Sequence, residues 1–182
     1  LTDDATRNGN ASPYSVDKVE GVSFSLNRLG IFSSSGDRPQ LISNAVERYI
    51  YNDANTGIQG TVFDTAPGAI SRYNYLVAVG STTEDITYRT LQNGVLKYDY
   101  QANLWTTDDM AVLPTAMREF INNDRSSAFV FGDASGKTYL LGGTAKTDAG
   151  TAIESELMYL IHFGKPHLEK KYNFLTAFFN PG

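Results

Sequence analysis

The sequence predicts an all-β chain made of antiparallel sheets with one or two short helices. Aromatic residues are abundant, with 11 Tyr and 10 Phe, and they suit the pleated faces of strands. The 16 glycines suit the turns between strands. Hydrophobic residues make up 41% and charged residues 19% of the 182, so we expect the chain to fold around a core in one domain or at most two small ones.

The first part of the chain predicts a strand, a hairpin and a helix. Residues 22–26 alternate apolar and polar side chains, as a half-buried strand does. Residues 29–32 and 40–42 flank a turn-forming cluster at 34–37, which predicts the hairpin. After it, Asn44 is placed to cap a short amphipathic helix that connects one sheet to the next.

The middle of the chain contains strand-like runs at 61–63, 72–80 and 95–100. Residues 86–91 alternate as well. Because Asn-Gly pairs favour two-residue turns, Asn93-Gly94 predicts a hairpin between 86–91 and the strand that follows.

The next stretch is mixed. Within residues 106–123, a helical turn is predicted at 116–121. Strands are predicted at 127–131 and 138–141, on either side of a hairpin turn at 132–136.

The last stretch combines a polar loop with two apolar runs. The loop is predicted at 144–151, and continuous apolar strands at 157–163 and 172–179. The whole chain would then hold about ten strands.

Residues 75–143 carry an ordered set of features that resembles one repeat of the kelch-type β-propellers. The features are a strand that ends on glycine, a Tyr-Asp pair, a turn asparagine, a tryptophan and a double glycine, found here at Gly80, Tyr98-Asp99, Asn103, Trp105 and Gly142-Gly143. In this family, glycines let strand backbones approach closely near a central channel and aromatic residues fill the space between neighbouring sheets. The sequence departs from the pattern at Gly80-Ser81, where the family has a first double glycine.

The resemblance implies a partial or fragmentary β-propeller of about three blade-like antiparallel sheets. Gly80 and Gly142 recur 62 residues apart, somewhat more than the ~50 residues of a kelch blade. We expect an N-terminal arm at 1–20, propeller blades at 21–163, and a C-terminal link with a last strand at 164–182.

Three units are too few to close a ring, because propellers have at least four blades. Either the chain is a fragment of a larger propeller, or another chain supplies blades, or the units form an open β-sandwich. We favour the first, partly because the sequence begins with Leu1.

Two further stretches resemble propeller proteins of tailed-bacteriophage particles. Residues 28–37, followed by 42–50, resemble a strand, turn and strand that lead into a helix, and 163–172 resemble a link at the end of such propellers. This resemblance implies a structural component of the virion, such as a plug, a tail nozzle or a head-to-tail connector. Its partners would be other virion proteins and copies of itself.

Charge and composition exclude several other classes. The net charge of −5 argues against a general binder of nucleic acid or anionic membranes. Only a local basic patch at Lys165, Lys170 and Lys171 would suit phosphate, and a solvated linker is the more ordinary interpretation. The sequence has no cysteine and no apolar run of the ~18 residues that a membrane span needs.

Residues 132–138 come within one residue of a phosphate-binding loop motif, and they are also similar to the Asp-box turn of sialidase propellers. The phosphate loop must open a helix, whereas a strand is predicted to follow at once. We therefore interpret the stretch as a hairpin turn.

No other motif predicts catalysis or metal binding. His162 and His167 fall on opposite faces of a strand and are separated by Pro166, so a shared metal is not expected. Asp3-Asp4 and Asp108-Asp109 lack the rest of a calcium loop and are interpreted as solvated turn carboxylates. We therefore expect no enzymatic activity, no cofactor, and no catalytic or metal-ligating residue.

The alternative to a virion role is a carbohydrate- or protein-binding kelch-like module, such as a receptor binder. Trp105 and Tyr98 would stack on a host-surface glycan in that case. The more ordinary interpretation is that both rings fill the space between blades.

Overall fold

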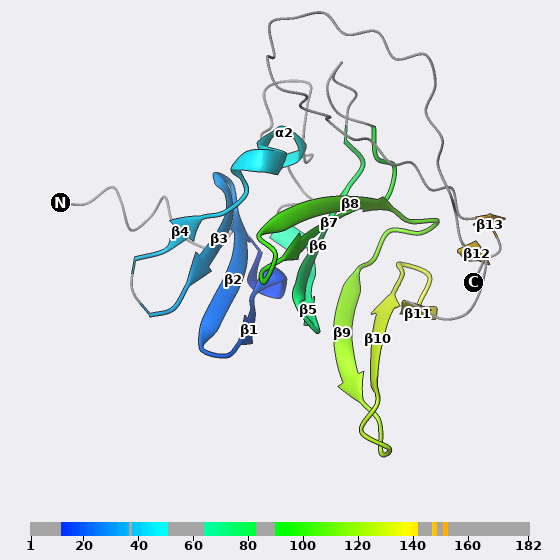
Figure 1. Cartoon of the computed structure of the whole chain (residues 1–182). Helices are drawn as coiled ribbons and strands as arrows, with labels where there is room; N and C mark the ends of the chain where they lie inside the picture. The colour runs from blue at the N-terminus through cyan, green and yellow to red at the C-terminus, as the bar shows by residue number, and fades with distance from the viewer. Residues whose placement is uncertain are drawn as a thin grey trace, which may run out of the picture.

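The structure is a computed structural model, and it describes residues 12–36, 38–50, 64–82 and 90–141, together with the backbone of 147–148 and 151–152. Within these residues, three antiparallel sheets of three or four strands follow one another along the chain (Figure 1). The predicted all-β class is confirmed, as is the prediction of about three blade-like sheets with short connecting helices.

The first sheet is a meander in which each strand pairs with the next. Its order is β1-β2-β3-β4, and its strands are Asp17–Val19, Val22–Asn27, Gly30–Ser34 and Gln40–Leu41. The predicted strand at 22–26 and the predicted pairing of 29–32 with 40–42 are confirmed. The 3-10 helix η1 (Pro13–Ser15) and β1 lie within the segment predicted as an arm, and residues 1–11 of that segment are outside the described residues.

The predicted connecting helix follows the first sheet as η2 (Asn44–Val46) and α2 (Glu47–Ile50). Its apolar face is buried as expected, through Val46, Tyr49 and Ile50. The predicted cap is wrong, because Asn44 is the first helical residue and Ser43 precedes it. The hydroxyl of Ser43 accepts a hydrogen bond from Ile31 N at 2.9 Å, so it bonds to the first sheet instead of capping the helix.

The second sheet is another four-stranded meander. Its order is β5-β6-β7-β8, and its strands are Gly68–Ser71, Asn74–Gly80, Gly94–Asp99 and Leu104–Asp109. Every residue of β6 after Asn74 is buried, since both faces of this sheet are covered. The predicted strand at 61–63 lies outside the described residues.

The predicted Asn93-Gly94 hairpin is wrong. Strand β7 begins at Gly94, and its two edges are taken by β6 and β8, so neither edge is left for a strand at 86–91. Residues 83–89 are outside the described residues, and Thr82 N, which precedes them, donates a hydrogen bond to Leu91 O. The non-local pairing with β6 has outweighed the local turn signal.

The third sheet has the order β11-β10-β9, and its strands are Thr138–Leu141, Ser127–Gly132 and Ala116–Ile121. The predicted hairpin of 127–131 with 138–141 is confirmed. The predicted helical turn at 116–121 is wrong, because this run is β9 and pairs with β10 along its whole length. Residues 104–109, for which no strand was predicted, form strand β8.

A small two-stranded ladder follows the third sheet. It consists of β12 (Thr147–Asp148) and β13 (Thr151–Ala152), within a segment predicted as a loop. The strands predicted at 157–163 and 172–179 are outside the described residues.

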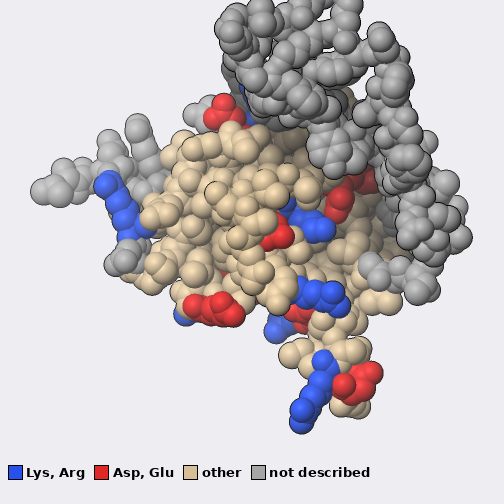
Figure 2. All heavy atoms as spheres, in the orientation of Figure 1, with Lys and Arg blue, Asp and Glu red and all other residues tan. Residues whose placement is uncertain are grey.

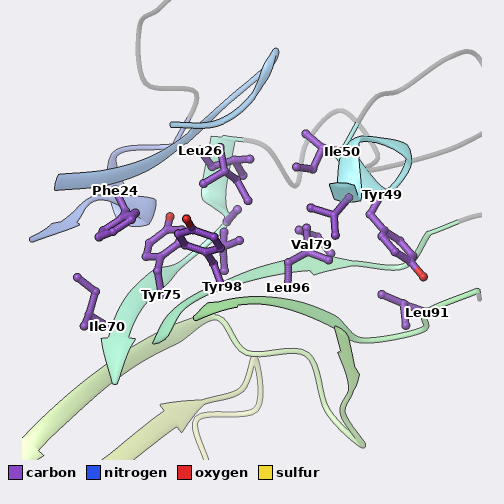
Figure 3. Close-up of a cluster of buried hydrophobic side chains, with 14 residues drawn as sticks. Phe24, Leu26, Tyr49, Ile50, Ile70, Tyr75, Val79, Leu91, Leu96 and Tyr98 are labelled. Atoms are coloured by element: carbon purple, nitrogen blue, oxygen red, sulfur yellow. The ribbon is translucent and has the colours of Figure 1, made fainter. Parts of the chain in front are cut away.

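The three sheets stack in series through two apolar cores. The first core joins the first sheet and the helix to the second sheet, and Figure 3 shows Phe24 and Leu26 directed toward Tyr75 and Tyr98. The second core lies between the other face of the second sheet and Phe129 of the third. The first strands of the sheets lie side by side, β1 against β5 and β5 against β9.

The connections between the first and second strands of the three sheets share one feature. In each, one residue other than glycine is left-handed: Glu20 with φ 49°, Arg72 with φ 52° and Arg125 with φ 66°. The connections differ in length, with two, two and five residues, and Asn103 between β7 and β8 is left-handed as well, so this conformation is not specific to one position of the repeat.

The repeat has a different register from the one predicted. First strands begin at residues 17, 68 and 116, so the units recur after 51 and then 48 residues. The predicted pairing of Gly80 with Gly142 is wrong, because Gly80 ends the second strand of its sheet whereas Leu141, next to Gly142, ends a third strand.

No helix in the described part of the chain is long and apolar enough to span a membrane.

Candidate functional surface

Trp105 and Tyr98 lie at the junction of the first two sheets. Their ring centroids are 4.8 Å apart, and Trp105 Nε1 donates a hydrogen bond of 2.9 Å to the carbonyl oxygen of Ile42. The ring centroid of Phe24, in the first sheet, lies 6.2 Å from that of Tyr98. The interpretation of both aromatic residues as inter-sheet packing is confirmed.

A second set of contacts joins the first strands. The carboxylate of Asp17 accepts a hydrogen bond of 2.7 Å from Ile70 N, which links β1 to β5. The hydroxyl of Tyr75 donates to Ser15 O at 2.6 Å. Burial raises the pKa of Tyr75 well above its ordinary value, so this hydroxyl keeps its proton.

The motif at 132–138 forms a hairpin turn, as expected. Asp133 Oδ1 accepts hydrogen bonds from Ser135 N at 2.9 Å and from Lys137 N at 3.0 Å. Its second oxygen accepts from the hydroxyl of Tyr139 at 2.9 Å. These bonds, led by the Ser135 hydroxyl, lower the pKa of Asp133 to about 2. Backbone amides of this turn therefore donate to the Asp133 carboxylate, and strand β11 follows the turn.

Other aspartates organise turns in the same way. Asp109 Oδ1 accepts from Gln92 N and Asn93 N at 2.9 and 2.8 Å. The interpretation of Asp108 and Asp109 as turn carboxylates is wrong, because both lie in strand β8, although both are exposed as expected. Asp99 of the Tyr-Asp pair accepts from Gln101 N and Ala102 N. Sequence reasoning missed these roles, because the N–H donors to Asp109 come from a loop 16 and 17 residues away.

Several predicted residues lie outside the described part of the chain. They are Asp3, Asp4, Gly142, Gly143, His162, Lys165, His167, Lys170 and Lys171. Among the described residues, no group of three or more His, Cys, Asp or Glu side chains could hold a metal ion. Figure 2 shows lysine and arginine side chains scattered over the visible face, with no large basic patch.

The stack of sheets ends in two outer faces, and these are the candidate functional surface. On the third sheet, register places Phe120 beside Ala128 and Leu140 beside Val130. Phe120 is 52% exposed and Leu140 is 59% exposed, whereas Phe129 on the other face is buried. Arg118, which is exposed, lies beside Val130 on the same face. Within the described residues, this outer face is therefore open and mostly apolar, with one arginine near its centre.

The outer face of the first sheet is smaller and mixed in character. Register places Phe32 beside Leu41 on one side and beside Ser25 on the other. Leu41 is 42% exposed, and Ser25 and Phe32 are half-buried. Neither outer face was predicted, since alternation identifies two faces of a strand without saying which of them meets another sheet.

No family model matches this sequence, and no curated protein matches it at a significant level.

Proposed function

We propose that this chain is a non-catalytic structural module of the β-propeller type, and that it works by binding other protein subunits. The observation that carries the proposal is the stacking of three meander sheets with their first strands side by side. Stacking of this kind creates flat sheet faces at each end, and burial of such faces is a common basis of subunit association.

A kelch-like architecture is supported by three features. The units recur after 51 and 48 residues, close to the ~50 residues of a kelch blade. Trp105 and Tyr98 pack between neighbouring sheets, as the aromatic residues of that family do. A carbon atom added at Gly94 would lie 2.9 Å from Gly80 O, so these paired glycines permit a close backbone approach.

We further propose that the chain belongs to a tailed-bacteriophage particle. The support is the resemblance of residues 28–37 and 42–50 to propellers of such particles, in which a strand, a turn and a strand lead into a helix. The same order occurs here as β3, β4, η2 and α2. Other virion proteins and copies of this chain are the proposed partners, and the virion is the proposed location.

The outer face of the first sheet is the proposed subunit interface. Phe32 and Leu41 provide an apolar centre, Ser23 and Ser25 provide small hydroxyl groups around it, and Lys18 lies beside Ser23 at the edge of the face. The small serine side chains keep this part of the sheet face flat, which suits packing against another sheet at an inter-sheet distance of about 10 Å.

The test compares the full chain with a variant that carries Phe32→Asp and Leu41→Asp. We expect the unmodified chain to form a ring or larger assembly in sedimentation velocity, or to capture an identified structural protein from disrupted phage particles. The double variant should weaken either association at least ~10-fold, because each new carboxylate must be desolvated at the interface.

The matched control is Leu104→Asp. Leu104 is 62% exposed, and it lies on the face of β8 opposite to Trp105, which packs toward the first sheet, so this variant should associate normally. Circular dichroism checks that all variants fold. A chain that stays monomeric at high concentration and captures no structural virion protein would refute the proposal.

The carbohydrate-binding alternative has less support, because Trp105 is half-buried and hydrogen-bonded between sheets. Glycan binding that disappears in a folded Trp105→Ala variant would favour this alternative.

A further inference from the structure

An Asn-Gly pair, Asn93-Gly94, lies where the chain enters β7. Asparagine followed by glycine is unusually open to deamidation, because glycine has no side chain to keep its backbone nitrogen away from the asparagine amide. The pair does not form the hairpin that its sequence predicts. The described structure shows instead how this reactive pair is held.

The Asn93 side chain is fixed by contacts with the end of β8. Its Nδ2 donates a hydrogen bond of 2.9 Å to Met110 O, and Asn93 O accepts one of 3.2 Å from Met110 N. Asn93 N and Gln92 N both donate to Asp109 Oδ1. The side-chain amide carbon Cγ, which deamidation must attack, is therefore held toward β8.

The attacking atom, Gly94 N, is directed the other way. Because Met110 N donates to Asn93 O, residues 93 and 110 form a hydrogen-bonded pair. The next pair, Gly94 with Asp109, is then non-hydrogen-bonded. The N–H of Gly94 therefore points away from β8 and toward β6, where Gly80 is its partner. Gly94 is also buried, and a carbon added to it would lie 2.9 Å from Gly80 O, so the backbone has little space to turn.

Deamidation of this pair needs water as its only co-reactant. Gly94 N loses its proton to water and attacks Asn93 Cγ. A C–N bond forms, the Cγ–Nδ2 bond breaks, and ammonia leaves with a proton taken from water. Water then opens the resulting cyclic imide at one of its two carbonyl carbons, which gives aspartate or isoaspartate. Nothing is oxidised or reduced.

Neither product fits the native contacts. The donor Nδ2 becomes a carboxylate oxygen, so two acceptors would face each other where Nδ2 now lies 2.9 Å from Met110 O. The new charge would also be close to the Asp109 carboxylate, which is bonded to the backbone of residue 93. In isoaspartate the backbone runs through the former side chain and is longer, so Gly94 would lose its register with β6 and β8.

We propose that Asn93-Gly94 is a latent deamidation site. The folded second sheet keeps the pair unreactive, and opening of the sheet at residues 92–94 exposes it to a reaction whose products cannot restore the native contacts. Deamidation at Asn93 is thus an irreversible mark of local opening at this end of the sheet. The inference concerns one sheet and does not rest on the proposed function.

The first test compares deamidation rates by peptide mapping with mass spectrometry. The samples are the full chain in buffer, the full chain in urea, and a blocked peptide of residues 91–96, all at the same mildly alkaline pH. We expect Asn93 to react at least about ten-fold more slowly in the folded chain than in the peptide, and at the peptide's rate in urea. Mapping separates this site from the other Asn-Gly pair, Asn8-Gly9.

The second test loosens the contacts around the pair. Asp109→Ala removes the acceptor of two backbone N–H groups and should speed deamidation at Asn93 at least about three-fold in the folded chain. The matched control is Asp108→Ala, at the neighbouring exposed carboxylate of β8, which should leave the rate unchanged. Circular dichroism checks that both variants fold.

The third test mimics the product with Asn93→Asp. We expect the Met110 amide, which donates to Asn93 O, to exchange at least about ten-fold faster in this variant than in the unmodified chain. Asn123→Asp, in the connection between β9 and β10, is the control and should leave the Met110 amide unchanged. The rate comparison on the unmodified chain decides the matter if the variants do not fold.

Three results would overturn the proposal. Asn93 could react as fast in the folded chain as in the peptide. Its slow reaction could persist in urea, so that the neighbouring sequence and not the fold protects it. Exchange of the Met110 amide could also be unchanged in a folded Asn93→Asp variant, so that the product fits the native contacts. None of these results bears on assembly through Phe32 and Leu41, which is measured separately.

Discussion

The indole nitrogen of Trp105 lies 2.9 Å from the carbonyl oxygen of Ile42, 63 residues earlier in the chain. This hydrogen bond connects the last strand of the second sheet to the residue that follows the last strand of the first. Together with the link from Asp17 to Ile70 N between the first strands, it joins the two sheets at both of their edges. The sheets therefore have a defined orientation as well as a shared core.

Replacing Trp105 by phenylalanine should destabilise the fold by about 1–2 kcal/mol, because Ile42 O loses its donor while most of the ring packing remains. Trp105→Ala should cost more, about 2–4 kcal/mol, through the additional loss of contacts with Tyr98. Urea unfolding measures both values. Leu104→Ala, at an exposed neighbouring position, should change stability by less than ~0.5 kcal/mol; equal effects at residues 104 and 105 would contradict the packing role of Trp105.

Tyr75→Phe should cost about 1–3 kcal/mol at neutral pH, because Ser15 O would remain buried without the Tyr75 hydroxyl. The effect should also depend on pH. The pKa of Tyr75 is raised in the folded state, so its contribution is complete below the unfolded pKa of about 10 and is lost as the pH rises toward the folded pKa. Denaturant unfolding at pH 8 to 11 should show that the variant loses less stability than the unmodified chain over this range. If the free energy of unfolding fell equally in the two proteins, Tyr75 would not be the source of the pH dependence.

Asp133→Asn should weaken the β10–β11 hairpin, because the neutral amide accepts hydrogen bonds from the turn less strongly than the carboxylate does. The pKa of Asp133 is lowered to about 2, so the stabilisation is present above the ordinary pKa of about 4 and is lost as the pH falls through 2. NMR titration of the side-chain carboxyl carbon should give a midpoint near pH 2. Asp108→Asn, at an exposed position on β8, is the control and should leave the hairpin unchanged. A midpoint for Asp133 near pH 4 would show that the turn bonds do not favour the charged form.

Gly68→Ala should destabilise the fold by about 2 kcal/mol or more, because the new carbon would lie 2.6 Å from Ser15 O and 2.8 Å from the Tyr75 hydroxyl. Gly132 provides a matched comparison at a strand end. A carbon added there would lie 3.7 Å from Lys137 O, an ordinary contact, so Gly132→Ala should be neutral or slightly stabilising. Thermal unfolding of the two variants tests the difference, and a neutral Gly68→Ala would mean that the first strands are less closely packed than described.

Residue pattern alone predicted those parts of the fold that depend on local sequence. The alternation at 22–26 and the turn cluster at 132–136 gave a correct strand and a correct hairpin, because both depend on neighbouring residues. The same logic was wrong at Asn93-Gly94 and at 116–121. In both places the outcome depended on a partner strand from elsewhere in the chain, β6 for the first and β10 for the second.

Most of the candidate surface could not be predicted from the sequence. The resemblance to kelch repeats indicated that Trp105 and Tyr98 fill the space between sheets, and the structure places both rings there. It did not identify Phe32, Leu41, Phe120 or Leu140. Their exposure depends on which face of each sheet meets its neighbour, and that is a property of three sheets together.

The amino-acid sequence by itself determined the all-β class and the two hairpins within 29–42 and 127–141, since these follow from side-chain alternation and local backbone preferences. Only the tertiary structure decided the register of the repeat, the role of Asp109 and the identity of the two open faces. The physical reason is that each of these depends on contacts between residues distant in sequence. For Asp109, the partners are the N–H groups of Gln92 and Asn93, which come within 3 Å only when the second sheet has formed.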